Sequence, residues 1–400
     1  MRTEIVFLRE LLSEIRNGLD TDQYDEPLDD NMLPITRIET ISASVVDFSR
    51  VKYALVSLAD QEKYRLKSGD ILFSHINSPE HIGKAAIFRS DRILIHGINL
   101  LLLRPKPERC YAEYLSYYLG SASVRARFRT RCKRAVNQAS LNHDDIVSLE
   151  VPLPPLPEQQ RITSILARAD RLRRLCRYAL ELSAGYLQAV FLEMFGDPMT
   201  NPKGWEIDSL DRVITDTKNG FGSRDVADTG GTIVLRIRDV GAGSIDYSEP
   251  RRIKMSPDEV AQYRLEDGDL LLVRVNGNPN LVGRASLFRP IGEPVAFSDH
   301  IIRVRLDQGQ KNLDYLLHLL NSPYGRAQML GSVTTTAGQF TVNRSGLSRV
   351  AIPFPSIDLQ EEFAGVVSRY QHLRAQQQEA ARQAEHLFQA LLHKAFSGEL

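Results

Sequence analysis

The chain has 400 residues, 42% of them hydrophobic and 25% charged, which is enough for two globular domains with a core each. Lys plus Arg and Asp plus Glu both number 50, so any nucleic-acid contact must depend on local patches rather than on net charge. The three separated cysteines argue against a disulfide framework or a zinc site and favour a reducing compartment. The N-terminal residues lack a secretory apolar region, and the most apolar window, Ile93 to Leu103, is too short to span a membrane. We therefore expect a cytoplasmic protein.

Short strands and one helix are predicted along the first 150 residues. ITRIETI, GDILFSHI and ILIHGINLLLL are alternating or wholly apolar segments of strand length. Lys-Ser-Gly-Asp, beginning at Lys67, is typical of a turn that precedes a strand. A helix is expected from about Tyr111 to Lys133. This pattern predicts a small mixed α/β domain with more antiparallel than parallel pairing.

A proline-rich strap and a long helix follow this domain. VPLPPLPEQQ, Val151 to Gln160, has four prolines in its first seven residues, and the chain from Arg161 to Phe195 has none. Because proline joins neither a helix interior nor a central ladder, we expect the strap to be an extended segment outside any ladder. The proline-free residues predict a long helix.

The second half of the chain repeats the first. YRLKSGDILF at Tyr64 returns as YRLEDGDLLL at Tyr263, a shift of 263 − 64 = 199 residues. IGKAAIFR at Ile82 returns as VGRASLFR at Val282, a shift of 282 − 82 = 200. So small a drift predicts two copies of one unit. The predicted parts are a first domain at 1–150, a strap and long helix at 151–199, a second domain at 200–351, and a strap and long helix at 352–400.

Both long helices have apolar residues at alternating spacings of three and four, as in helices that coil around each other. Because each helix follows its own domain, an antiparallel pair predicts pseudo-two-fold symmetry. A fixed-length spacer and an ordinary stabilising hairpin both fit this pattern. The predicted seam residues are Ile162, Ile165, Ala169, Leu172, Cys176, Ala179, Tyr186, Val190, Phe363, Val366, Tyr370, Leu373, Ala380, Ala384, Leu387 and Leu391.

The order of globule, LPPLPEQQRI strap, long helix, second globule, IPFPSIDLQEE strap and second long helix resembles the specificity (S) subunit of type I restriction–modification enzymes. The resemblance covers essentially the whole chain. It implies that each globule is a target recognition domain for one half of a bipartite, asymmetric site on double-stranded DNA. It also implies that the helices set the gap and seat two methyltransferase (M) subunits, which restriction (R) subunits join. The chain itself is then no enzyme, and no cofactor is expected.

Two kinds of DNA contact are expected in the repeated loops. The basic stretch RARFRTRCKR suits phosphate binding, although a solvated helix face has the same pattern. Base recognition requires paired donors and acceptors, and residues that differ between the copies are the better candidates for sequence choice. Residues kept in both copies also fit a role in holding the loop backbone. The candidates are His75, Asn77, Lys84, Arg125, Arg127, Arg129, Arg131, Lys133, Arg134, Asn137, Gln138 and Asn142 in the first copy, and Arg274, Asn276, Arg284, Gln339, Asn343 and Arg344 in the second.

The sequence contains no complete catalytic motif of the kinds considered below. NSPY, Asn321 to Tyr324, resembles the N-P-P-Y motif of amino-methyltransferases, but no Gly-rich turn for a methyl donor precedes it, and Ser322-Pro323 suits a helix start. No H-E-x-x-H, phosphate loop or nucleophile elbow occurs. Two alternatives stay open: a coiled-coil scaffold that does not contact bases, and a DNA reader of another methyltransferase-based phage-defence system.

Overall fold

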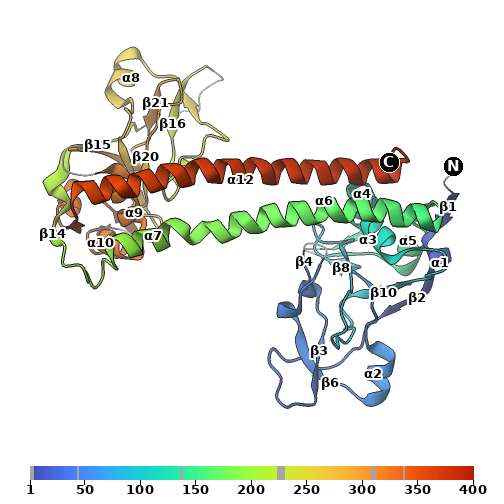
Figure 1. Cartoon of the computed structure of the whole chain (residues 1–400). Coiled ribbons are helices and arrows are strands. Elements are labelled where there is room, and N and C mark those ends of the chain that lie inside the picture. Colours follow the sequence, from blue (N-terminus) through green and yellow to red (C-terminus); the bar gives the residue numbers. More distant parts are fainter. Residues whose placement is uncertain (1–3, 43–44, 136–137, 223–229, 308–311, 337) are drawn as a thin grey trace. The chain divides into compact units, whose positions relative to one another are not determined.

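The computed structural model describes residues 4–42, 45–135, 138–222, 230–307, 312–336 and 338–400 (Figure 1). The chain divides into two compact units: unit 1 comprises Met1–Tyr178 and Gln378–Leu400, and unit 2 comprises Ala179–Gln377. Each unit combines helices with mainly antiparallel strands, which confirms the predicted mixed α/β class.

The central sheet has the same strand order in both units. In unit 1 its antiparallel strands are, in order, β2 (Leu12–Asn17), β10 (Leu101–Pro105), β7 (Ile71–Phe73) and β9 (Ala85–Ile87). In unit 2 they are β15 (Ile214–Asn219), β22 (Ile301–Leu306), β18 (Leu270–Val273) and β20 (Ala285–Leu287). The internal repeat of the sequence is therefore also a repeat of topology.

Two smaller sheets are repeated as well. One pairs the start of each globule with its strap: β1 (Glu4–Phe7) with β13 (Glu150–Leu153), and β14 (Glu206–Ser209) with β25 (Ala351–Phe354). The other, which we call the hairpin sheet, has three strands. They are β8 (Ile76–Asn77), β12 (Gln138–Ser140) and β11 (Lys133–Ala135) in unit 1, and β19 (Val275–Asn276), β24 (Gln339–Thr341) and β23 (Thr334–Thr336) in unit 2.

Between these repeated sheets, each unit has strands of its own. Unit 1 has β3 (Met32–Ile35) with β6 (Lys52–Leu55), β4 (Ile41–Ser42) with β5 (Val45–Val46), and helix α2 (Leu58–Tyr64). Unit 2 has β16 (Thr232–Leu235) between β17 (Arg252–Ile253) and β21 (Val295–Phe297), and helix α8 (Pro257–Tyr263). The β16–β21 pair is parallel.

Short helices cover the central sheets. They are α1 (Leu8–Leu11), α3 (Ala112–Gly120), α4 (Ala122–Arg131) and α5 (His143–Val147) in unit 1, and α9 (Leu313–Asn321), α10 (Pro323–Gly331) and α11 (Arg344–Leu347) in unit 2. The single helix predicted from Tyr111 to Lys133 is thus two helices. Ser121 separates them because its Oγ accepts a hydrogen bond from Val124 N at 3.4 Å and caps α4. Ser322 caps α10 in the same way.

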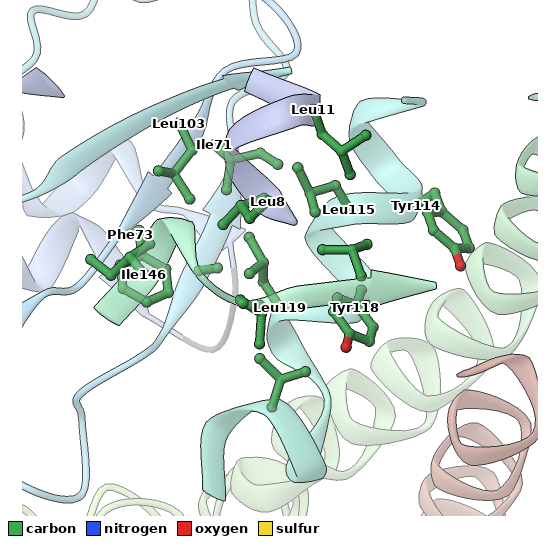
Figure 2. Close-up of a cluster of buried hydrophobic side chains, with 14 of the residues drawn as sticks. Leu8, Leu11, Ile71, Phe73, Leu103, Tyr114, Leu115, Tyr118, Leu119 and Ile146 are labelled. Carbon is green, nitrogen blue, oxygen red and sulfur yellow. The ribbon is translucent and has the colours of Figure 1, made fainter. Parts of the chain in front are cut away.

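The core of unit 1 forms where these helices meet the sheet. Figure 2 shows Leu8 from α1, Phe73 from β7, Leu103 from β10, Leu115 from α3 and Ile146 from α5 in one cluster. All five side chains are fully buried. They come from positions 8 to 146 of the chain, so this core fixes the sheet and the helices against each other.

The straps are partly strands, which corrects the prediction that their prolines join no ladder. Pro152 lies opposite Ile5 in the β1–β13 ladder, and its carbonyl accepts a hydrogen bond from the Tyr114 hydroxyl at 2.6 Å. Because the N and C=O of one residue point to the same side of a strand, the nitrogen of Pro152 faces away from β1. The proline therefore removes no ladder hydrogen bond. Pro353, bonded to the Tyr315 hydroxyl at 3.1 Å, repeats the arrangement in unit 2.

The two long helices differ in continuity. The first consists of α6 (Leu156–Leu182), a 3-10 turn (Ser183–Gly185) and α7 (Tyr186–Phe195), whereas α12 (Ile357–Ser397) is unbroken over 41 residues. At the turn, Ser183 Oγ donates to the Leu180 carbonyl at 3.1 Å, and Gly185 weakens helix propensity. The predicted long helix is present, with one irregular turn.

The predicted seam is only partly buried. In unit 1 the helices meet through Arg173, which pairs with Glu385 at 3.3 Å and lies 4.0 Å from the ring centroid of Phe388. This contact line runs one residue after the predicted Leu172, because a salt bridge and a cation–π contact replace the apolar pair. In unit 2 Tyr186, itself half exposed, stacks on Tyr370.

The remaining seam predictions divide by exposure. Leu172, Leu373, Ala380 and Leu387 are exposed, which corrects their assignment to a buried seam. Ile162, Ala169, Phe363 and Ala384 are buried. Ile165, Cys176, Ala179, Val190, Val366 and Leu391 are half-buried.

Candidate nucleic-acid interface

A short loop beside the hairpin sheet of unit 1 collects several of the predicted cations. We call this segment, Ser78–Lys84, the clamp loop of unit 1; it follows β8 directly. From α4, Arg125 Nη2 and Arg129 Nη2 both donate to the Glu80 carbonyl, at 3.2 and 3.0 Å. Two helix cations thus hold the backbone of the loop, and Lys84 lies at its end.

The clamp loop lies so close to α4 that it needs a glycine. Gly83 has a φ of +76°, a conformation that L side chains rarely adopt. A Cβ at this position would lie 3.3 Å from the ring of Phe128 in α4. Gly83 N also donates to the Ser74 carbonyl at 2.9 Å, which ties the loop back to the end of β7.

Unit 2 repeats this construction in Asn278–Arg284, the clamp loop of unit 2. Arg326 of α10 donates through Nη2 to the carbonyls of Pro279 and Asn280, both at 3.3 Å. Gly283 has a φ of +71°, and a Cβ there would lie 2.9 Å from Met329 Cβ. The same three features therefore recur: a held loop, a glycine against the helix, and a cation at the end of the loop.

The clamp-loop cations lie close together without an acidic partner. Burial, and then the nearby Arg125, lower the pKa of Lys84, while burial and Arg129 lower that of Arg125. In unit 2, burial and Arg284 lower the pKa of Arg326. Among the residues described, none of these side chains makes an ion pair with a carboxylate (the full set is Lys84, Arg125, Arg129, Arg284 and Arg326). An anion from outside the chain would therefore be favoured here.

The other predicted phosphate ligands are more dispersed. Arg127 lies 3.9 Å from Glu150, Arg131 donates weakly to Ser148 Oγ at 3.5 Å, and Lys133 is exposed at the start of β11. In unit 2, Arg344 pairs with Asp211 at 2.5 Å. Asn137 falls outside the described residues, and only the backbone of Arg134 and Gln138 is described.

The asparagines kept in both copies hold backbone. Asn142 Oδ1 accepts from Asp145 N at 2.7 Å and caps α5, and Asn343 Oδ1 accepts from Gly346 N at 2.7 Å and caps α11. Asn77 and Asn276 each accept a backbone N–H of their own clamp loop at 2.8 Å. The amide oxygens of these four residues are therefore already engaged.

The positions that differ between the copies have different surroundings. His75 is buried, and burial lowers its pKa. The equivalent Arg274 is half-buried and donates to the Asp299 carbonyl at 2.9 Å. Gln339 is exposed at the start of β24 in the hairpin sheet. Its side chain is therefore accessible to DNA, and no side-chain hydrogen bond to another described residue engages it.

Two repeated buried networks were missed by the sequence reasoning. Asp70 of the G-D-I-L turn accepts from Arg104 Nε at 2.7 Å and from Lys67 N at 2.7 Å. Asp269 makes the equivalent bonds with Arg305 Nε and Glu266 N, both at 2.8 Å. Both aspartates are almost fully buried, so they hold the turn against the sheet. The available signal was an arginine that follows the aspartate at a similar spacing in both copies, 34 residues in unit 1 and 36 in unit 2.

The second network holds the straps. Gln159 Nε2 donates to the Pro154 carbonyl at 2.8 Å, and Gln159 Oε1 accepts from Tyr111 N at 2.8 Å. Gln360 bonds the Pro355 carbonyl and Asn312 N in the same way. The glutamines kept at the end of each strap therefore tie the start of the long helix to the globule.

The NSPY segment has a structural role. Asn321 Oδ1 accepts from Ala285 N at 3.1 Å, and its Nδ2 donates to the Ala285 and Leu317 carbonyls. Ser322 and Pro323 begin α10, as the sequence indicated. Within the described residues, no cluster of three or more His, Cys, Asp or Glu side chains fits a metal ion. No described helix is both long and apolar enough to cross a bilayer.

Comparison with known proteins finds a matching domain and several similar proteins. A family model for the "Type I restriction modification DNA specificity domain" matches residues 3–177. The putative type I restriction enzyme MjaX specificity subunit of Methanocaldococcus jannaschii is 46% identical over 171 residues, 42% of this chain and 40% of that protein. The chain thus spans less than half of that relative. The type I restriction enzyme StySPI specificity subunit of Salmonella potsdam is 26% identical over 393 residues, 93% of this chain and 83% of the relative.

A solved structure shows the same fold. The type I restriction–modification system S subunit from M. genitalium superposes with a TM-score of 0.60 at 14% identity, over 99% of this chain and 96% of that chain. Sequence similarity to specificity subunits along most of the chain agrees with this shared fold and with the repeated units. Residues 3–177 therefore match a type I restriction–modification DNA specificity domain, and the chain as a whole is similar to type I restriction enzyme specificity subunits.

Proposed function

We propose that this chain is the DNA-specificity subunit of a type I restriction–modification complex. The observation that carries the proposal is the repeated hairpin sheet and clamp loop, present in both units of a chain related to specificity subunits over 93% of its length. Each globule, at 1–150 and 200–351, recognises one half of a bipartite site on double-stranded DNA. Because the described surfaces differ between the units, the two half-sites differ.

The long helices then set the gap between half-sites and seat two methyltransferase subunits, which restriction subunits join. α12 alone has 41 residues, so it is about 60 Å long at about 1.5 Å per residue. Two half-sites one helical turn apart are separated by about 34 Å, which a spacer of this length can bridge. In this proposal the chain contributes binding and positioning, and its partners carry out the chemistry in the cytoplasm.

Genome-wide methylation mapping tests the proposal in a host that expresses this chain with its neighbouring methyltransferase. We expect a split, asymmetric motif with a fixed gap that disappears when this chain is deleted. A contiguous motif, or one unaffected by the deletion, would favour a scaffold that does not contact bases. A split motif in a host without any restriction translocase would instead indicate another methyltransferase-based defence system.

A further inference from the structure

The two clamp loops end in equivalent cations, Lys84 and Arg284. Each loop is held by an arginine of the following helix through backbone carbonyls, Arg125 in unit 1 and Arg326 in unit 2. An arginine that bonds a carbonyl keeps its charge uncompensated, unlike one that pairs with a carboxylate. Each loop therefore presents at least two positive charges that the described part of its own unit does not neutralise.

Burial strengthens the need for an external anion. Lys84, Arg125, Arg284 and Arg326 are all half-buried, so part of their hydration is lost. Within the described residues, the buried atoms Arg125 Nε and Arg326 Nη1 have no hydrogen-bond partner. At equivalent helix positions in both units, neither guanidinium charge is thus compensated, and each adds to the positive potential at Lys84 or Arg284.

The chemistry of the repeated positions favours phosphate over a base. A phosphate needs a positive charge but no fixed donor pattern, so Lys84 and Arg284 are interchangeable there. A base contact depends on the donor arrangement and would differ between unequal half-sites, as His75 and Arg274 do. Each clamp loop also continues from the hairpin sheet, β8 or β19, next to the candidates for base recognition.

We propose that Lys84 and Arg284 each bind one backbone phosphate of double-stranded DNA, and that Arg125 and Arg326 are positioning residues that hold the loops. The inference rests on the proposed function, because it assigns a role to one part of the same DNA surface. It predicts two matched phosphate contacts, one in each half of the site, that carry no sequence information.

The test measures DNA binding by the complex of this chain with its methyltransferase as a function of KCl concentration. Lys84→Gln and Arg284→Gln should each lower the slope of log K against log salt by about 0.9, the value for one phosphate contact. The loss should be equal for specific and non-specific duplexes, and the methylated motif should be unchanged. Lys84→Arg and Arg284→Lys should retain the slope.

The chain offers matched controls. Arg89 and Arg289 occupy equivalent positions in the two units, and each pairs with a carboxylate at 3.2 Å, Glu113 and Asp267 respectively. Arg89→Gln and Arg289→Gln remove the same charge outside the clamp loops and should leave the slope unchanged. An equal loss in the controls, or a changed base preference in Lys84→Gln, would overturn the phosphate assignment.

The positioning role has its own readout. If Arg125 acts only through the loop, Lys84→Gln/Arg125→Gln should lose no more slope than Lys84→Gln alone; an additional loss would show that Arg125 itself contacts DNA and would refute positioning. Thermal melting of each variant checks folding.

Inorganic phosphate at matched ionic strength should not displace the duplex, whereas displacement would show a site for free phosphate and overturn the DNA assignment. A wild-type complex that binds DNA without site preference would refute the proposed function. The salt slopes of the wild-type and Lys84→Gln complexes would still test whether the clamp loop of unit 1 binds a phosphate.

Discussion

Units 1 and 2 share a framework and differ in what lies between its strands. The four-stranded sheet, the hairpin sheet and the strap ladder have the same order in both. Between β2 and β7, unit 1 inserts two-stranded antiparallel ladders. Unit 2 instead inserts β16 and β17 between β15 and β18, and β16 pairs in parallel with β21, which follows β20. In both units, buried polar networks hold the strap and the Gly-Asp turn of this framework. This indicates that the framework depends on long-range contacts, while the inserts can change without disturbing it.

The largest expected effect follows from exchanging a whole unit. Replacing residues 1–150 with the matching domain of another specificity subunit should abolish methylation of one original half-site and leave the other half and the gap unchanged. The physical reason is that each unit has its own core and its own hairpin sheet. Methylation mapping measures both halves together. A change in both half-sites would show that the units do not recognise DNA independently.

Removing the buried aspartates should be the most damaging point change. Asp70→Ala leaves Arg104 with Glu14 alone, and Asp269→Ala leaves Arg305 with Glu266 alone. Each should cost about 3–5 kcal/mol, since a largely buried cation loses its principal partner. The effect should be larger at Asp70, because the Arg104 side chain is 21% exposed and that of Arg305 31%. Hydrogen exchange in β7 and β18 peptides reports each unit separately, and equal protection in variant and wild type would contradict the assigned role.

Acid should weaken unit 1 through a residue that unit 2 lacks. Burial lowers the pKa of His96 to about 4, while its Nε2 lies 2.9 Å from the Leu100 carbonyl. Because the folded pKa lies below the unfolded value of about 6.5, this contribution to stability is present above pH 6.5 and is lost as pH falls towards 4. The shift corresponds to about 3 kcal/mol. His96→Gln keeps a donor for Leu100 and cannot titrate, so urea unfolding should lose this part of its pH dependence. If the pH dependence of unfolding were the same in His96→Gln and wild type, another titrating group would be responsible for it.

The clamp-loop glycines sharpen the comparison at a smaller scale. Gly83→Ala should cost about 1–2 kcal/mol from the positive φ alone. Gly283→Ala should cost more, about 2–3 kcal/mol, since the new Cβ would lie 2.9 Å from Met329 Cβ, compared with 3.3 Å from the Phe128 ring at Gly83. Thermal melts of the two variants rank the costs. A larger loss of stability in Gly83→Ala would mean that α10 moves away from the new methyl group at Gly283 more easily than α4 does at Gly83.

The smallest expected effect concerns the irregular turn in the first long helix. Gly185 has a φ of −91°, and a Cβ there would meet no atom within 4 Å. Gly185→Ala should therefore stabilise the chain by about 0.5–1 kcal/mol by restricting the unfolded state. Gly365→Ala in the continuous α12 is the control and should give a similar gain in thermal stability. A destabilised Gly185→Ala variant would show that the 3-10 turn itself is needed.

The predicted DNA-contact and seam residues show what spacing along the sequence can and cannot determine. The repeat located Lys84 and Arg284 as equivalent cations, because spacing along the chain is retained in both copies. It left Asn142 and Asn343 with two roles, contact with DNA or support of the loop backbone, because the same amide suits both. In the structure both cap helices. The seam failed at Leu172 and Leu387 because apolar spacing tolerates a shift of one residue.

The sequence by itself determined the duplication, the order of globule, strap and long helix, and the resemblance to specificity subunits, because these depend on residue order and spacing alone. Only the tertiary structure decided that Arg125 and Arg326 hold loop carbonyls, and that Asp70 and Asp269 hold arginines of a neighbouring strand. The same side chains suit solvent, DNA or a buried carbonyl equally well. Which of these they contact depends on the packing of segments 30 to 50 residues apart, which local periodicity does not encode.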